Sequence, residues 1–541
     1  MLLMIRNTLG RSAAAALIAT AALVAVPPHP ALAQAQVTPF MSAIAETAAL
    51  DAEIAAFYRA NGFEPIWVGD TPEQQARRSA LLMALRRSGD HALPVDSYGI
   101  EPLVTAMQNI TTQRDLGRVE VMLSKAFLKY ARDVSTGILT PKEIDSGIAR
   151  DVPRRDGEEL LRSFAEANPV LFLRGLPPKA PEYTRLMKAR IELQKQLARG
   201  GWGPTVPASS LKPGDSGAAV VALRNRLIAM GYMQRSASMV FDADLEKAVQ
   251  LFQHDMGLNT DGVAGATTMR EVNVQIEERL PSILVAMERE RWMNIERGKR
   301  HVWVNLAAFT TYIVDDGEVT FRTRSVIGAN SSDRRSPEFS DTMEYMEINP
   351  YWNVPRSIAM GEYLPAMIAS GGAAAGQFEL VAGGGQVVPR GSVNWSRYSP
   401  RNFPFNLRQP PSRTNALGLV KFMFPNQYNI YLHDTPTKSL FAQDRRDFSH
   451  GCIRLADPFD FAYALLARQV DNPVEYFQTI LQSGANTQVP LEQPIPVHLV
   501  YRTAFTSPKG RLNFRHDVYG RDARIFDALI SAGVVLNELR S

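Results

Sequence analysis

The 541-residue chain has one cysteine, Cys452, and eight histidines. A lone cysteine cannot form an internal disulfide, so Cys452 is either an incidental buried thiol or a reactive group. Charge is nearly balanced, with 59 Lys and Arg against 55 Asp and Glu. This balance provides no argument for a nucleic-acid partner. Beyond the N-terminal region no run is apolar enough to cross a bilayer.

The first 33 residues have the pattern of an export signal. Arg6 and Arg11 precede an alanine- and leucine-rich run, and Ala31-Leu32-Ala33 has the small-x-small pattern of a cleavage site. We therefore expect a signal peptide at residues 1–33 that is removed after Ala33, and not an uncleaved membrane anchor. Its removal lowers the formal charge from +4 to +2. Exported chains usually contain cysteines in pairs, which favours a reactive role for the single thiol.

The next part of the chain divides by composition. Residues 40–200 are predicted to be a helical scaffold, because apolar residues recur at spacings of three and four in runs such as Val121–Val134. The Gly-, Pro- and Ser-rich stretch Gly200–Ser210 predicts a linker. Apolar stripes that end in glycines predict a small three-helix unit over 211–273, and a linking helix follows over 274–299.

From about residue 300 the pattern changes to that of strands. Apolar residues alternate over 302–306, and Asp316-Gly317 lies between two strand-like runs, which predicts a hairpin. We expect a β-rich domain over 300–485 and a C-terminal extension over 486–541. The predicted fold class is therefore multidomain α+β.

The β-rich domain is interrupted at residues 356–416. This stretch mixes glycine-rich and proline-rich pieces with aromatic residues. A long insertion just before the strands that carry the cysteine motif predicts a flexible lid over a cleft, with a surface loop of no function as the alternative.

One short segment near the C-terminus combines Cys452 with His433 and His450. A thiolate attacks carbonyls well and an imidazole can take its proton, so the pattern predicts nucleophilic catalysis. His433 ends a predicted strand, and a loop can return the chain to place Cys452 beside it. The imidazole needs an orienting group, either the Asp434 side chain or a backbone carbonyl. Gly451 allows the backbone to approach an oxyanion closely.

Two other interpretations of this segment compete with catalysis. His433, His450 and Cys452 could bind zinc, but a structural zinc site requires four protein ligands and there is no second cysteine. Cys452 could also be a merely buried thiol, which the S-H-G-C-I-R sequence around it disfavours. We therefore expect no metal and no other cofactor.

Two patterns resemble known families. The first, L-x-x-G-x-x-G-x-x-V-x-x-L followed by A-V-x-x-F-Q-x-x-x-G-L-x-x-D-G-x-x-G-x-x-T over 211–273, resembles the bacterial peptidoglycan-binding domain. The second, H-D-T-P over 433–436 followed by S-H-G-C-I-R over 449–454, resembles the signature of the YkuD-type L,D-transpeptidase catalytic domain. The whole layout is similar to the large periplasmic members of that family, which have a scaffold domain and a peptidoglycan-binding domain.

The resemblance implies roles for the residues of the motif. Cys452 would be the nucleophile and His433 the general base, oriented by a backbone carbonyl. His450 and Gly451 would shape the site, with a backbone N–H near Cys452 in the oxyanion hole. Arg454 would either orient the substrate or form an ion pair that fixes the loop.

Two aromatic residues near the motif are further candidates. Tyr431 and Trp352 are expected to line the substrate cleft, although packing in the core explains either of them about as well.

The resemblance also implies a reaction and a location. In the periplasm, the enzyme would cross-link peptidoglycan stem peptides through a Cys452 thioester and release terminal D-alanine, which contributes to cell-wall organisation and cell shape. Carbapenem β-lactams would be inhibitors, and cell-wall synthesis proteins are a further class of partner. The alternatives are L,D-carboxypeptidation, attachment of a protein to peptidoglycan, or a non-catalytic wall-binding scaffold. The small domain could bind glycan or act as a spacer.

Overall fold

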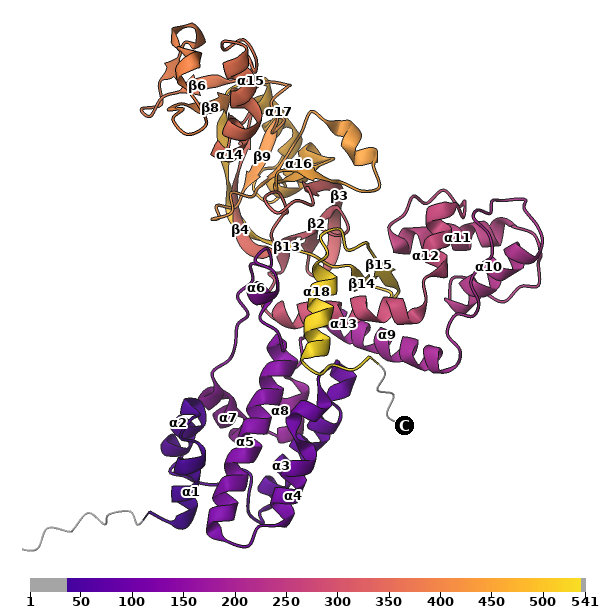
Figure 1. Ribbon diagram of the computed structural model, residues 1–541, viewed down its shortest axis with the longest axis vertical. Coiled ribbons are helices and arrows are strands. Elements are labelled where there is room, and N and C mark those ends of the chain that lie inside the picture. Colours follow the sequence, from indigo (N-terminus) through magenta and orange to yellow (C-terminus); the bar gives the residue numbers. More distant parts are fainter. Residues whose placement is uncertain (1–36, 537–541) are drawn as a thin grey trace, which may run out of the picture.

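The computed structural model describes residues 37–536, so the expected signal peptide lies outside the described residues. The molecule is elongated, with a helical bundle at one end and a β domain at the other (Figure 1). A three-helix unit projects sideways from the middle. Within residues 37–536 no helix combines the length and the apolar character needed to cross a membrane.

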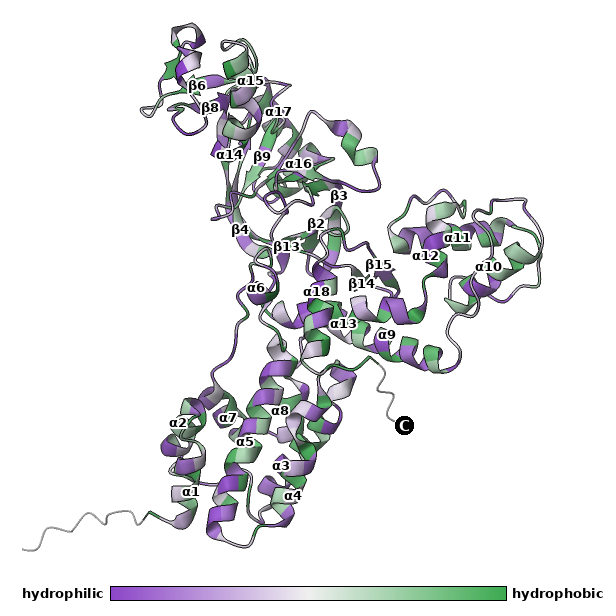
Figure 2. Cartoon of the chain, in the orientation of Figure 1, coloured by the Kyte–Doolittle hydropathy of each residue, from purple (hydrophilic) through white to green (hydrophobic). Residues whose placement is uncertain are grey.

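The bundle is built around the long helix α5 (Gln113–Thr136). A capping box between Thr112 and Asp115 starts this helix, and its apolar face, including Leu123 and Phe127, is fully buried. Bundle helices carry both apolar and hydrophilic residues along their length (Figure 2). The other helices of the bundle and the short helix that leaves it are α1 (Pro39–Thr47), α2 (Ala52–Ala60), α3 (Pro72–Arg86), α4 (Ile100–Gln108), α7 (Gly157–Glu166), α8 (Pro169–Arg174) and α6 (Pro141–Ile144).

The last helix of the expected scaffold, α9 (Pro181–Ala198), leaves the bundle and packs along α13 (Ile276–Trp292). The three-helix unit lies between these two helices in sequence and shares a hydrophobic core with them. A glycine in the left-handed conformation, Gly257, ends its second helix. Its helices are α10 (Ala218–Ala229), α11 (Ala243–Met256) and α12 (Ala266–Asn273).

Nine strands of the described chain form one mixed sheet in the order β11-β3-β12-β10-β9-β4-β13-β1-β2. Because β2 also pairs with β3, the sheet closes on itself. Asp316 and Gly317 both have positive φ at the β2–β3 turn, as a two-residue hairpin of this kind requires. The strands are β1 (Arg300–Asn305), β2 (Thr310–Asp315), β3 (Glu318–Gly328), β4 (Phe339–Ile348), β9 (Val420–Met423), β10 (Leu432–His433), β11 (Asp447–Ser449), β12 (Ile453–Leu455) and β13 (Thr487–Val500).

The predicted end of the β domain at residue 485 is too early. β13 begins at Thr487 and lies inside the sheet, parallel to β1 and antiparallel to β4. Its prolines conceal it in the sequence, and a register shift between Pro490 and Ile495 accommodates them. Helices α16 (Pro458–Leu466) and α17 (Pro473–Gln482) pack on the sheet, and the chain then forms β14 (Ala504–Thr506), β15 (Leu512–Phe514) and α18 (Arg521–Ser531).

The insertion at 356–416 is a packed subdomain, which its glycine-rich sequence did not predict; its flexibility and its role as a lid stay predictions. Together with the residues that flank it, it forms a separate buried apolar core and a sheet in the order β5-β8-β6-β7, in which β5 precedes the insertion. A Cβ on Gly372 would lie 2.2 Å from the Trp395 indole nitrogen, so this glycine permits close packing. The elements are β5 (Trp352–Asn353), α14 (Arg356–Ile358), a π-helical turn (Ala359–Tyr363), α15 (Leu364–Ala369), β6 (Glu379–Val381), β7 (Val387–Val388) and β8 (Asn406–Gln409).

Candidate active site

The site is built on two neighbouring parallel strands. Leu432 of β10 pairs with Ile453 of β12, and His433 pairs with Arg454. Side chains alternate between the two faces of a strand, so His433 and Arg454 share a face with the residues two positions earlier. Those residues are Tyr431 and Cys452. The fold therefore brings the four predicted site residues to one face across a single strand pair.

This face forms one wall of a cavity of about 810 Å³. The opposite wall comes from the insertion and from the loop after β3, with Glu362 and Arg334 among the lining residues. Of the residues predicted from the sequence, Gly451 is buried behind the cavity wall, and the others line the cavity: Trp352, Tyr431, His433, His450, Cys452 and Arg454.

The Cys452 thiol is half-buried and donates a hydrogen bond to the Asn429 carbonyl at 3.5 Å. Burial raises the pKa of Cys452 to about 11. Hydrogen bonds from Tyr431 and the positive charges of Arg454 and Lys421 act in the opposite direction but do not cancel the effect of burial. Cys452 is therefore a thiol and not a thiolate at neutral pH.

The His433 imidazole is buried, and its Nδ1 lies 2.5 Å from the Asp434 carbonyl oxygen. A backbone carbonyl thus occupies the orienting position. The Asp434 carboxylate points elsewhere, accepting from the Lys438 ammonium at 2.7 Å and the Leu419 N–H at 2.9 Å. Burial, reinforced by the charge of Arg454, lowers the pKa of His433 to about 3. Hydrogen bonds of the imidazole with the Asp434 and Leu417 backbone act against this fall in pKa. With Nδ1–H donating to the Asp434 carbonyl, Nε2 is the ring nitrogen that would accept the thiol proton.

Cys452 and His433 share the cavity as a neutral pair. No hydrogen bond between them is present among those of residues 37–536, because Cys452 lies opposite Tyr431, two residue pairs away from His433 along the strands. Diagonal neighbours on one sheet face lie about 7–8 Å apart, within reach of long side chains. A rotation of the Cys452 side chain away from Asn429 is therefore needed for proton transfer.

The turn before Cys452 has a backbone conformation that glycine adopts more readily than other residues. Gly451 has φ +119° and lies against Ile430. The Ser449 hydroxyl accepts from the Gly451 N–H at 3.1 Å and donates to the Cys452 carbonyl at 2.6 Å. In the described chain no acceptor is found for the Cys452 N–H, which leaves this donor available beside the thiol.

His450 contacts the insertion instead of Cys452. Its Nε2 lies 2.6 Å from Glu362, and the Arg334 guanidinium donates to the same carboxylate oxygen at 2.7 Å. All three side chains are about one-third exposed. The carboxylate therefore ties the subdomain to the cysteine motif across the mouth of the cavity.

Arg454 is half-buried and forms no ion pair with any residue in 37–536. Its Nε has no hydrogen-bond partner there. A guanidinium that lines a cavity and has no carboxylate partner suits a ligand carboxylate. Of the two roles expected for Arg454, the arrangement favours orientation of the substrate.

Comparison with known families agrees with this geometry. A model described as the L,D-transpeptidase catalytic domain matches residues 299–476, which include both strands of the site. Residues 299–476 are an L,D-transpeptidase catalytic domain. Two further models, "Scaffold domain" and "Putative peptidoglycan binding domain", match residues 52–189 and 216–271 of the same chain.

Individual relatives cover parts of the chain. A Haemophilus influenzae protein named "Putative L,D-transpeptidase" is 30% identical over 257 residues, which are 47% of this chain and 51% of that protein. The match thus spans about half the length of the relative. General secretion pathway protein A from Aeromonas hydrophila is 44% identical over 43 residues, 8% of either chain.

A crystal structure of an L,D-transpeptidase from Stackebrandtia nassauensis is 14% identical. The match covers 55% of this chain and 97% of that one, with a TM-score of 0.22, which is too low to carry an argument.

Several residues of this site were not predicted from the sequence. Glu362 and Arg334 lie 88 and 116 residues before His450 along the chain, in segments with no motif. Asn429, which accepts from the thiol, has a positive φ, a conformation that asparagine tolerates, but nothing in its local sequence marks it. Within the described residues no group of three or more His, Cys, Asp or Glu side chains is placed to hold a metal ion.

Proposed function

We propose that this protein is a periplasmic L,D-transpeptidase that cross-links peptidoglycan stem peptides through a thioester on Cys452. The observation that carries the proposal is the placement of Cys452 and His433 on one face of paired strands, at a cavity inside an L,D-transpeptidase catalytic domain. The peptidoglycan-binding and scaffold domains support a cell-wall substrate.

In the first half-reaction the Cys452 sulfur attacks the carbonyl of the third stem residue, usually meso-diaminopimelate. His433 Nε2 takes the thiol proton as the C–S bond forms, and the proton then goes to the departing amine. The peptide bond breaks and D-alanine leaves. The imidazole is neutral and can accept a proton, but a pKa of about 3 makes it a weak base, so proton transfer has to accompany formation of the C–S bond and cannot precede it.

The Cys452 N–H is the candidate donor for the oxyanion of the tetrahedral intermediate. It belongs to the residue that makes the attack and has no acceptor within the described chain. Arg454 would bind a carboxylate of the donor stem, and Tyr431 and Trp352 would line the donor site.

In the second half-reaction the side-chain amine of a neighbouring stem attacks the thioester, the C–S bond breaks and the thiol is restored. Transfer competes with hydrolysis, so water must be kept out until the acceptor arrives. The subdomain that holds Glu362 against His450 and Arg334 provides a cover for this purpose.

The test is a muropeptide assay with purified protein and a disaccharide tetrapeptide substrate. Cross-linked dimers and free D-alanine are expected from the wild type and not from Cys452→Ala. Tripeptides without dimers would replace the proposal with L,D-carboxypeptidation, and transfer to a protein amine alone would indicate protein anchoring. If the wild type gives neither product and no carbapenem adduct forms on Cys452, the protein is a wall-binding scaffold.

A further inference from the structure

The peptide unit that joins Gly451 to Cys452 is held from behind. The Ser336 hydroxyl, in the loop between β3 and β4, donates to the Gly451 carbonyl at 2.6 Å. Ser336 is fully buried. This hydrogen bond lies on the side of the turn away from the cavity, since neither Ser336 nor Gly451 lines it.

Because of the geometry of the peptide bond, this contact at the Gly451 carbonyl also affects the Cys452 N–H. A peptide unit is planar and trans, so its carbonyl and its N–H point in opposite directions. The N–H of the Gly451–Cys452 unit is that of Cys452, the candidate oxyanion donor. A hydrogen bond that fixes the Gly451 carbonyl therefore fixes the direction of the Cys452 N–H as well. It also polarises that N–H towards a stronger donor.

Ser336 is in turn held by residues far away in sequence. Its hydroxyl accepts from the Gly328 N–H at 3.0 Å, and its N–H donates to the Tyr519 hydroxyl at 3.2 Å. The Tyr519 hydroxyl donates to the Gly328 carbonyl at 2.5 Å. Arg521 donates to the Ser336 carbonyl at 3.1 Å. Tyr519 and Arg521 are buried and lie beyond residue 476, where the family match ends.

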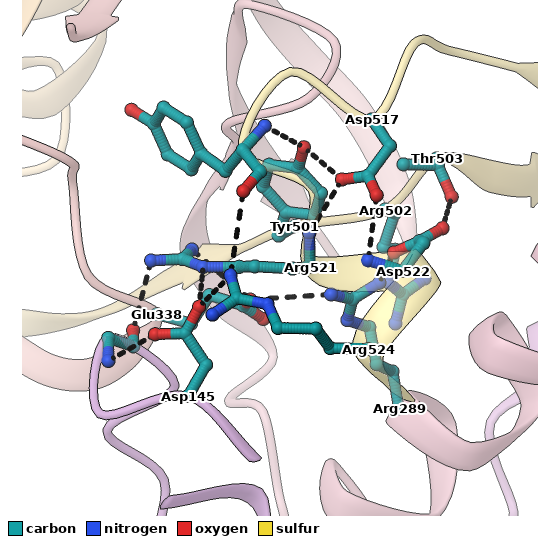
Figure 3. Close-up of polar contacts among 12 residues, drawn as sticks. Asp145, Arg289, Glu338, Tyr501, Arg502, Thr503, Asp517, Arg521, Asp522 and Arg524 are labelled. Carbon is teal, nitrogen blue, oxygen red and sulfur yellow. Dashed lines mark hydrogen bonds and ion pairs between the residues drawn. The ribbon is translucent and has the colours of Figure 1, made fainter. Parts of the chain in front are cut away.

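Arg521 connects this loop to the scaffold. It donates to the Gly147 carbonyl at 3.3 Å and forms ion pairs with Asp145 at 3.5 Å and Glu338 at 3.2 Å. Figure 3 shows the Arg521 guanidinium beside these two carboxylates, with Asp522 of the same helix beside Arg289 of α13. The charges are buried and paired, so breaking one pair leaves an uncompensated buried charge. The network therefore keeps the 328–336 loop in one position.

We propose that Ser336 is a positioning residue that aims the Cys452 N–H at the oxyanion, and that Tyr519 of the C-terminal extension holds Ser336 in place for this task. The inference rests on the proposed acyl-enzyme chemistry. It gives the C-terminal extension a role in the chemical step. One hydrogen bond joins Tyr519 to Ser336, and a second joins Ser336 to the carbonyl of the peptide unit that carries the Cys452 N–H.

The experiment compares two reactions of the same thiol. Acylation of Cys452 by meropenem forms an oxyanion, whereas alkylation by iodoacetamide does not. Ser336→Ala should slow acylation by about 10- to 100-fold, somewhat less than removal of an oxyanion donor, because the donor is misaimed and not deleted. Alkylation at the same pH should stay within about twofold of the wild type, as a role in aiming the N–H alone implies.

Matched variants separate positioning from general damage to the fold. Ser325→Ala is the control, because it also removes a fully buried hydroxyl. The Ser325 hydroxyl lies in the nine-stranded sheet, 2.8 Å from the Thr311 hydroxyl, and does not contact Gly451. Ser325→Ala should leave both rates near those of the wild type. Tyr519→Phe keeps the ring and removes the hydroxyl, and should slow acylation selectively even if Ser336→Ala folds poorly. In each variant the rate of D-alanine release from a tetrapeptide should fall by the same factor as the rate of meropenem acylation.

The outcomes can be told apart. Selective loss of acylation in Ser336→Ala and Tyr519→Phe supports the inference. Unchanged acylation in a folded Ser336→Ala or Tyr519→Phe overturns it, as does an equal fall of acylation and alkylation in Tyr519→Phe. If wild-type protein is alkylated but forms no meropenem adduct and releases no D-alanine, the proposed function itself fails.

Discussion

The elevated pKa of Cys452 gives a sharp test of the site. Burial raises this pKa from an ordinary value of 9.0 to about 11. Each unit changes the thiolate fraction about tenfold and corresponds to about 1.4 kcal/mol, so the two units correspond to about 2.7 kcal/mol. At pH 8 the thiolate fraction should be about one in a thousand, compared with about one in ten for an unperturbed thiol.

The assay is alkylation by iodoacetamide, because the thiolate is the reactive form. Cys452 is the only cysteine, so the mass shift of the intact protein reports on it alone. At pH 8 the folded protein should react about 100-fold more slowly than the same chain unfolded in urea, and its rate should still rise beyond pH 10. Cys452→Ala measures labelling at other residues.

A half-maximal alkylation rate at pH 9 or below would refute the reasoning. It would mean that the thiolate is stabilised in the folded protein, for example by a protonated His433, and that burial does not dominate. The mechanism would then begin from an ion pair and not from the neutral pair proposed above.

Three further predictions concern the same cavity. His433→Ala should lower the rate of meropenem acylation by about 10²- to 10⁴-fold, and an undiminished rate would move the base role to His450. Glu362→Gln should lower the ratio of dimer to hydrolysed tripeptide by about 10-fold, because it removes the charge from two hydrogen bonds that hold the subdomain. The control Glu379→Gln changes a carboxylate of the same subdomain that contacts Arg408 and not the motif, and it should leave the ratio unchanged. The same ratio in Glu362→Gln and in the wild type would exclude a covering role. Arg454→Gln should raise KM for the tetrapeptide about 10-fold with a smaller change in kcat, and an unchanged KM would return Arg454 to a structural role.

Much of the architecture could be predicted from local patterns. The helical scaffold, the three-helix unit and the hairpin at Asp316-Gly317 each depend on periodicity or turn chemistry within a few residues. β13 was missed because its prolines break the pattern of a strand, and its pairing with β1 and β4 depends on segments at least 139 residues away. The glycine-rich insertion was expected to be flexible, but it has an apolar core of its own, in which Gly372 permits close packing against Trp395.

By itself, the sequence predicted which groups would carry the chemistry. Cys452 and His433 could be proposed because their two motifs lie within one short segment and the thiol has no partner for a disulfide. Only the tertiary structure decided their protonation, since burial and the nearby charge of Arg454 set both pKa values. It also decided what surrounds them. Glu362 reaches His450, and Ser336 reaches Gly451, through contacts between distant segments that no local pattern encodes.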